Sequence, residues 1–528
     1  MITLPERELK WLENFCGALG LLVGGSLSQA LPSLENLCQS AKLQFGPEHG
    51  HRTAALSALA AAYLHSKKIE SAARAFQEAR YAADLALEQW ACDILLAAAF
   101  SGLAGVLVNQ KSYEDALLHC QKAISLAARD SAAVALGAVS LNLLLAQIHY
   151  LQAQYAKAAQ IFVQAAEAFM PHIQDKEDYS RLAQMHAQGA LANYWAGEIS
   201  EAQKSLEAVL NLRESCELEQ APLFVACINF LATIYREQGN PDSADTYLDW
   251  GLETCLEVYG MESSTGICAL NFAANHYLAA NDWSKASEYL KDGVQYVDQK
   301  LEAEEAMWML HKLVTISTMQ SDLRSQDAYE GILADIYFNQ YTGNYLSDKA
   351  LVENGDQGAA AKRQQKFHEA LAKVQAKYDT KLHPLVVEVL GLPDGVWSAP
   401  TIAMCRAYLL RYLDEHAPCL VPEQTHPGST DSTGDRAGIK PDVVTDANHE
   451  HQEEDWMEKI SSHISEGNHA QALTYVGELM HRVLHTEGPF SRELFPLFNA
   501  VAAIYEAKGE SIQAKTARLR AQLLAIRT

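Results

Sequence analysis

Two close pairs of histidines have the side chains and spacing from which metal sites are built: His49 with His51, and His449 with His451. Imidazole nitrogens are common zinc ligands, but a zinc site needs at least three protein ligands. Neither pair has a further ligand at helical spacing, since the first lies in an expected turn and the second in an acidic stretch. We therefore expect no metal site and no cofactor.

Paired carboxylates are a second feature that could do chemistry, as general acids and bases. Glu304–Glu305 and Glu453–Glu454 are adjacent along the chain rather than opposed across a cleft, so they fit solvated helix faces. The sequence has no phosphate-binding loop, dinucleotide turn, zinc-protease helix or nucleophile elbow. We expect no catalytic residue and no enzyme. The alternative is an enzyme hidden in residues 346–421, where Gly391–Gly395 and Trp397 are unusual.

The helices that must position these side chains follow a repeat. Its clearest copy, Phe230–Cys255, predicts two amphipathic helices joined by a turn at Gly239–Pro241. A small residue opens each second helix, and these residues recur at spacings of 42 or 44 at Ala30, Ala72, Ala116, Ala158, Ala202, Ala244, Ala286 and Ala328. A single pair cannot bury its apolar faces alone, so the pattern predicts stacked pairs.

The residues inside each copy indicate the type of repeat. The first helix carries two small residues and a tyrosine, and the second follows Ala-x3-Phe/Leu-x2-Ala, as at Ala72, Phe76 and Ala79. This pattern resembles the tetratricopeptide repeat, and the 42-residue period resembles its kinesin-light-chain type. Phe45–His49 and Lys381–Val386 look like that family's turns between repeats. The resemblance implies an all-α fold, an α-solenoid of stacked antiparallel helix pairs.

Four regions follow from the pattern. Residues 1–345 are expected to form a solenoid of about eight repeats, and residues 346–421 an irregular helical region with divergent repeats, helical near 365–378 and 401–415. Residues 422–455 are rich in Pro, Gly, Ser and acidic side chains, which predicts a flexible linker. Residues 456–528 hold further repeats, with Ala472 and Ala514 again 42 apart. Whether these stack on the main array is left open.

The composition narrows the class of partner and the compartment. The formal net charge is -25, from 66 acidic and 41 basic residues, so nucleic acid and membrane surfaces are poor partners. No run approaches the ~20 uninterrupted apolar residues of a membrane helix. Ten cysteines lie scattered without a CxxC pair, as expected for free thiols in a reducing compartment. We expect a cytoplasmic protein that binds other proteins and does not insert into membranes.

The candidate binding residues lie on the first helices, which in such an array line the concave groove. By resemblance to the tetratricopeptide family, Asn229, Asn271 and Asn499 occupy a place that meets ligands, where a carboxamide can clamp the main chain of a peptide. The alternative is that these asparagines hydrogen-bond between helices. Neighbouring places add further candidates: Thr233, Arg236, Asn275, Gln147, Tyr150 and Tyr194.

The early repeats present a more apolar wall on the same side. Its residues are Ser57, Ala61, Leu64, Ser101, Gly105 and Val108. Such a wall suits a partner helix or a hydrophobic motif, and it suits equally the tail or linker of the chain itself.

The function that these features favour is a non-enzymatic scaffold or adaptor. It would bind a peptide or helix of a partner protein in the concave groove. The alternative is a regulatory sensor, whose array closes on a small peptide or metabolite and switches an effector.

Overall fold

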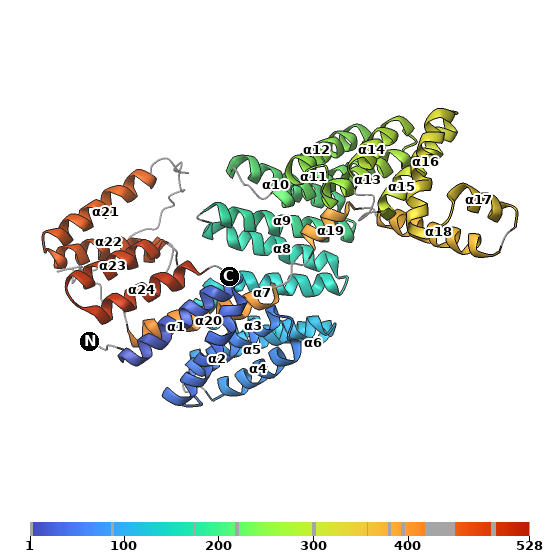
Figure 1. The fold of residues 1–528 in the computed structure, drawn as a ribbon. Helices are drawn as coiled ribbons and strands as arrows, with labels where there is room; N and C mark the ends of the chain where they lie inside the picture. The colour runs from blue at the N-terminus through green and yellow to red at the C-terminus, as the bar shows by residue number, and fades with distance from the viewer. Residues whose placement is uncertain are drawn as a thin grey trace. The chain divides into compact units, whose positions relative to one another are not determined.

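The computed structural model describes residues 4–526, except for 86–88, 174, 217–220, 298–302, 356, 379–381, 392–395, 418–448, 487–490 and 492. All regular secondary structure in this part of the chain is helical, which confirms the all-α prediction. Figure 1 shows the helices in chain order. The helices α21 and onward follow residues 418–448, so most of the predicted linker at 422–455 lies outside the described residues, and α21 already begins at His449.

The helices alternate between the first and second members of antiparallel pairs. The bounds through the eighth pair are α1 Glu6–Val23, α2 Leu27–Gln44, α3 Gly50–His65, α4 Ile69–Ala83, α5 Gln89–Asn109, α6 Tyr113–Ala127, α7 Ser131–Leu151, α8 Tyr155–Phe169, α9 Lys176–Ala196, α10 Ile199–Cys216, α11 Ala221–Glu237, α12 Pro241–Tyr259, α13 Ser264–Ala279, α14 Trp283–Tyr296, α15 Ala303–Met319 and α16 Leu323–Tyr341.

The chain then departs from the strict alternation before two closing pairs. The remaining bounds are α17 Tyr345–Glu353, α18 Ala359–Tyr378, α19 Pro384–Leu390, α20 Ala399–His416, α21 His449–Ser465, α22 His469–Thr486, α23 Leu494–Ala507 and α24 Ser511–Ala525, with short 3-10 turns η1 Met170–His172 and η2 Val396–Ser398. The helices predicted near 365–378 and 401–415 correspond to α18 and α20.

The chain forms two compact units. Unit 1 comprises residues 1–161 and 394–528, and unit 2 comprises residues 162–393. Consecutive pairs pack on one another within each unit, through α2 on α3, α4 on α5 and α6 on α7 in unit 1, and through α10 on α11, α12 on α13 and α14 on α15 in unit 2. The expected array at residues 1–345 therefore contributes to both units.

The small residue that opens each second helix lies at the closest approach of a pair. From Ala30 to Ala286 these alanines are completely buried, because a larger side chain would separate the two backbones. The chain reverses five positions earlier through a left-handed residue. Glycine occupies this place at Gly25, Gly197 and Gly239, but Lys67, Lys111, Ala153 and Asn281 adopt the same positive φ. The geometry of the pair thus imposes the turn even where the residue type does not favour it.

The eighth pair corrects one expectation. Its left-handed residue is Ser321, 40 positions after Asn281, so the period shortens by two there. Ala328 is consequently exposed instead of buried at the contact between α15 and α16. A two-residue shift turns a position by about 200° around a helix, to the opposite face. Leu333, Ile336 and Tyr337 supply the buried face of α16.

The turn before α12 gives a prediction about stability. Gly239 has φ +73°, and open space surrounds the position of a Cβ atom. Gly239→Ala should lower the free energy of unfolding by about 1 kcal/mol, because only backbone strain is introduced. Ala153→Gly is the reverse substitution at the equivalent turn, where Ala153 has φ 58°, so it should raise the free energy of unfolding by about 1 kcal/mol. Urea unfolding followed by circular dichroism measures both, and an unchanged Gly239→Ala would contradict the strain.

The core of unit 1 includes a helix from late in the chain. Helix α20 packs on α3, α5 and α7, which are first helices of three successive pairs, and α24 packs on α1 and α20. Two buried arginines join the closing pair to α20. The Nη2 atom of Arg406 donates to the main-chain oxygen of Leu524 at 3.0 Å, and that of Arg520 donates to the main-chain oxygen of Ala417 at 3.0 Å. The C-terminal pairs are thus part of unit 1.

Two helices of unit 1 are long and apolar enough to cross a membrane by length and composition, namely α5 and α7. Helix α5 packs on α3, α4, α6 and α20, and 83% of its apolar window is buried, so it is a core helix of the unit. Half of the α7 window is buried, and α7 packs on α6 and α20. Nine of the ten cysteines lie in the described residues, and each is a free thiol.

Candidate functional site

The first helices of unit 2 present two carboxamides to a polypeptide, and that polypeptide is the chain itself. Helix α18 packs on α13 and α15. The Nδ2 atom of Asn275 donates to the main-chain oxygen of Tyr378 at 2.8 Å, and the Nδ2 atom of Asn271 donates to the hydroxyl of Tyr378 at 3.2 Å. Asn271 is completely buried and Asn275 is half-buried. Both predicted residues therefore hold the last residue of α18.

Further side chains of α18 extend this contact in both directions. The Oε1 atom of Gln375 accepts from the indole of Trp308 at 3.0 Å, while its Nε2 atom donates to the Oδ1 atom of Asn275 at 3.1 Å. The rings of Trp308 and Tyr378 have centroids 5.3 Å apart. No local pattern marks these three residues, since Trp308 and Gln375 are 67 positions apart in the chain.

Two ion pairs flank the buried part of α18. Lys373 Nζ lies 2.9 Å from Glu304 Oε2, and Lys377 Nζ lies 3.3 Å from Glu305 Oε1. The adjacent carboxylates of Glu304 and Glu305, predicted to lie on a solvated face, are partly exposed, and each has a lysine partner. Because these lysines and Glu304 are substantially exposed, each pair contributes at most about 1 kcal/mol.

Helix α19 continues the same segment over earlier first helices, since it packs on α9 and α11. The Nε2 atom of Gln184, on α9, donates to the main-chain oxygen of Val389 at 3.3 Å. Gln184 is thus a second carboxamide, after Asn275, that donates to a main-chain oxygen of this segment, and the sequence analysis did not identify it. His383 caps α19 by accepting from the main-chain nitrogen of Leu385 at 3.0 Å, and its ring lies 4.6 Å from that of Phe272. Burial lowers the pKa of His383 to about 3.

Asn229 makes its contacts inside its own repeat. Its Nδ2 atom donates to the main-chain oxygen of Val225, one turn earlier, at 2.8 Å. The carboxamide lies directly against Gly251 of α12, where an added Cβ atom would be 2.8 Å from Nδ2. Asn229 therefore packs between the two helices of its pair, and the glycine opposite it leaves the room that it needs.

The remaining predicted residues are divided among local contacts. Tyr194 donates to Glu237 at 2.8 Å, Arg236 contacts His276 Nδ1 at 2.8 Å, and Thr233 donates to the main-chain oxygen of Asn229 at 3.3 Å. Tyr150 and Tyr155 have ring centroids 5.2 Å apart. Gln147 is buried, with no partner for its Oε1 atom among the described residues, and Asn499 is exposed on α23.

The apolar wall of the early repeats is covered by α20 and the turn before it. Thr401 lies 3.1 Å from the Ser101 hydroxyl, oxygen to oxygen. At Gly105 an added Cβ atom would be 2.9 Å from the Cβ of Trp397, and at Gly137 it would collide with the methyl group of Met404. The segment that covers this wall belongs to the chain itself, but it comes from the irregular region expected at 346–421 and not from the linker or the tail. Trp397 thus has a packing role in unit 1.

Each unit therefore has the same arrangement of its inner side. The first helices of the pairs are covered by a later segment, α18 and α19 in unit 2 and α20 in unit 1. In unit 2 the contact combines carboxamides on main-chain oxygens with a buried aromatic pair. Main-chain contacts of this kind hold a polypeptide whatever its side chains, whereas the bond from Asn271 to the Tyr378 hydroxyl and the ring contact with Trp308 select an aromatic residue at that position.

No family model matches the chain, and no curated protein matches it. Solved structures similar to it include three helical repeat proteins. The C-terminal part of a TPR repeat-containing protein from Cytophaga hutchinsonii is 17% identical with a TM-score of 0.35, over 53% of this chain and 93% of that chain. The apo form of RapI is 12% identical with a TM-score of 0.45, over 70% and 98%. The apo form of the quorum sensor NprR from B. thuringiensis is 14% identical with a TM-score of 0.41, over 69% and 99%. Tetratricopeptide-type structures are thus among those similar to this chain.

Proposed function

We propose that this chain is a non-enzymatic adaptor whose unit 2 binds a polypeptide segment of a partner protein along its first helices. The supporting observation is the bond from Asn275 to the main-chain oxygen of Tyr378 at 2.8 Å. It is a carboxamide contact to main chain of the kind expected for a bound peptide, made by Asn275 to a residue of the chain itself. A partner segment with the same contacts would replace residues 364–390.

The contacts of α18 define the chemistry of such a partner. Phe367 and Tyr378 are buried anchors on one face of the helix, and Lys373 and Lys377 reach acidic residues of α15 on another. A competing segment would be an amphipathic helix with aromatic side chains about three turns apart and basic residues one turn apart. The net charge of -25 also favours a basic partner over an acidic one.

A partner segment can replace residues 364–390 only if it supplies the free energy that their contacts contribute. Each buried aromatic anchor stabilises the internal contact by roughly 2 kcal/mol, whereas each exposed ion pair contributes less than about 1 kcal/mol. A short peptide without aromatic anchors would therefore fail to replace α18. Only a segment that supplies equivalent anchors would compete.

A synthetic peptide of residues 364–390, labelled with a fluorophore, tests the exchange on the full-length chain. It should bind Tyr378→Ala at least tenfold more tightly than the wild type, because that variant weakens the internal competitor and leaves the receiving helices unchanged. The matched control is the same peptide with the tyrosine at 378 replaced by alanine, which should lose most of the affinity. If the Tyr378→Ala variant binds neither peptide, the first helices of unit 2 form no exchangeable site and the proposal is wrong.

The same internal contact supports a second candidate, a regulatory sensor. If a ligand displaced residues 364–390, the displacement itself would be the signal passed to an effector. Small-angle scattering distinguishes the two, because the array of a sensor should become more compact when the ligand is added, whereas an adaptor exchanges one bound segment for another and its array should keep its dimensions. The labelled peptide is the ligand for this measurement.

A further inference from the structure

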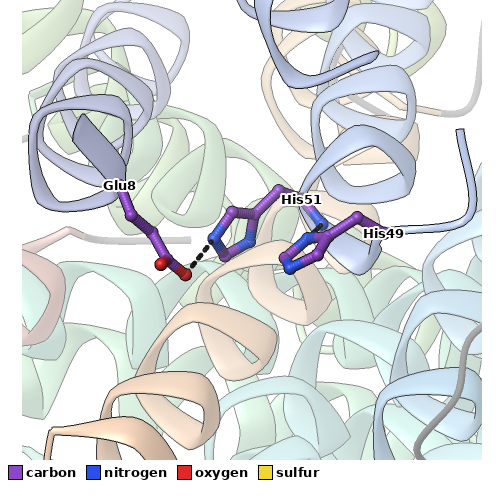
Figure 2. A group of neighbouring side chains, drawn as sticks. All are labelled: Glu8, His49 and His51. Atoms are coloured by element: carbon purple, nitrogen blue, oxygen red, sulfur yellow. Dashed lines mark hydrogen bonds and ion pairs between the residues drawn. The ribbon is translucent and has the colours of Figure 1, made fainter. Parts of the chain in front are cut away.

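Three side chains of types that can bind metals lie together in unit 1: Glu8 on α1, and His49 and His51 at the start of α3. Glu8 lies in the first turn of α1, His49 is the N-cap residue of α3, and His51 lies in its first turn. One ligand atom from each residue can be chosen so that all lie within 4.8 Å of one another. Figure 2 shows the imidazole of His51 between the carboxylate of Glu8 and the ring of His49.

Neighbouring rings hold the imidazole of His51 in place. Trp11 stacks on it with a centroid distance of 4.6 Å and an interplanar angle of 6°. Its Nε2 atom lies 3.3 Å from Glu8 Oε1, and its Nδ1 atom lies 3.0 Å from the hydroxyl of Tyr408. The hydroxyl of Tyr412 donates to the same carboxylate oxygen of Glu8. His51 is completely buried, so its orientation is fixed by these contacts.

This arrangement has the features of a metal site before metal binds. Two imidazoles and a carboxylate are a known ligand set for zinc and for non-haem iron. Two ligands about 2.0–2.2 Å from a tetrahedral ion are roughly 3.3–3.6 Å apart, which matches the separation of His51 Nε2 from Glu8 Oε1. The second nitrogen of a ligating histidine is normally hydrogen-bonded, and Tyr408 supplies that partner.

An ion has a route to this group from one side. Glu8 and His51 are both buried. His49 is half-buried, so an ion could reach the group from its side.

We propose that Glu8, His49 and His51 bind one divalent transition-metal ion of the zinc class. The ion would replace the hydrogen bond between Glu8 and His51, and His49 would turn from its present role as acceptor of the His51 main-chain N–H. Tyr408 and Tyr412, both on α20, would be the outer partners of the ligands. The site would tie α1, α3 and α20 together, with the ligand Glu8 standing 43 positions before His51 in the chain.

Cobalt(II) is the probe for this site, because its absorption reports ligand number and geometry. The full-length chain is stripped with a chelator, dialysed and titrated with cobalt(II), then with zinc(II) in competition. We expect one tetrahedral or five-coordinate ion per chain, displaced by zinc. His49→Ala and Glu8→Gln should weaken binding more than tenfold, and Tyr408→Phe, which removes the outer partner of His51, should weaken it 10–100-fold.

His65→Ala is the matched control, since His65 is a half-buried histidine on the same helix α3 and should leave cobalt binding unchanged. Circular dichroism of the metal-free variants shows whether they fold, and Glu8→Gln preserves the shape of the site if another variant does not. Absence of saturable binding in the wild type would show that the group is a hydrogen-bonded cluster only. Undiminished binding in folded His49→Ala and Glu8→Gln would place the ion elsewhere, for example at His449 and His451. Either result overturns the proposal.

Discussion

Tyr378→Ala is expected to lower the free energy of unfolding of unit 2 by about 3–5 kcal/mol. Tyr378 is 1% exposed, its ring packs on Trp308, and its hydroxyl accepts a hydrogen bond from Asn271. Alanine removes the ring and leaves the carboxamide of Asn271 without this partner in a buried place, so a cavity and an unpaired donor arise together. Urea unfolding measures the loss.

Tyr378→Phe is the matched control for the ring. It keeps the packing on Trp308 and removes only the hydroxyl, so the expected loss is about 1–3 kcal/mol. Hydrogen exchange shows where the loss occurs. Protection should fall first in α18 and α19 if the segment detaches from an intact array. A loss in Tyr378→Ala no larger than in Tyr378→Phe would contradict the role of the ring.

A second large effect should appear in the pH dependence of unit 2. His383 is buried and its pKa in the folded chain is lowered to about 3, from about 6.5 when unfolded. Below pH 6.5 the unfolded chain takes up a proton that the folded chain does not, so stability falls as the pH falls toward 3. Between pH 7.5 and pH 5.0 this histidine alone should lower the free energy of unfolding by about 2 kcal/mol.

The variant His383→Asn isolates this contribution, because asparagine keeps a side-chain acceptor at the N-cap of α19 and does not titrate. The variant should be less stable than the wild type at pH 7.5, where the ring packing against Phe272 is lost. As the pH falls below 6, its free energy of unfolding should nevertheless decline less steeply than that of the wild type. The two slopes should differ by about 1.4 kcal/mol per pH unit. Equal slopes in the two proteins would show that His383 is protonated in the folded state.

The local rules of the repeat were readable from the sequence. The alanines at the contacts between paired helices are recognisable because few residue types allow two helices to approach closely. The turn glycines are recognisable because glycine adopts positive φ readily. Lys67, Lys111 and Ala153 were not recognisable as left-handed, because their side chains do not favour positive φ. Ala328 was assigned two positions out of phase, since the repeat shortens where its other marker residues are also absent.

The contacts between distant segments were not readable. The amphipathic periods of α18 and α20 were visible, but a helical period shows which side is apolar and not which helices it meets. Asn271 and Asn275 were assigned to the inner side, and each contacts α18, more than a hundred residues later. Separation along the chain also concealed the group at Glu8, His49 and His51, because the carboxylate stands 43 positions before His51, outside any local ligand motif.

The coverage of α3, α5 and α7 by α20 has a consequence for synthesis on the ribosome. Ser101 contacts Thr401, which lies 300 positions later in the chain. Contacts over such a separation do not occur in a simple solenoid, where each repeat contacts only its neighbours. At roughly 5–20 residues per second, the first pairs would emerge about 15–60 s before the helix that shields them. Chaperones should therefore be needed to protect the nascent chain during that interval. A polypeptide ending near residue 345 should aggregate.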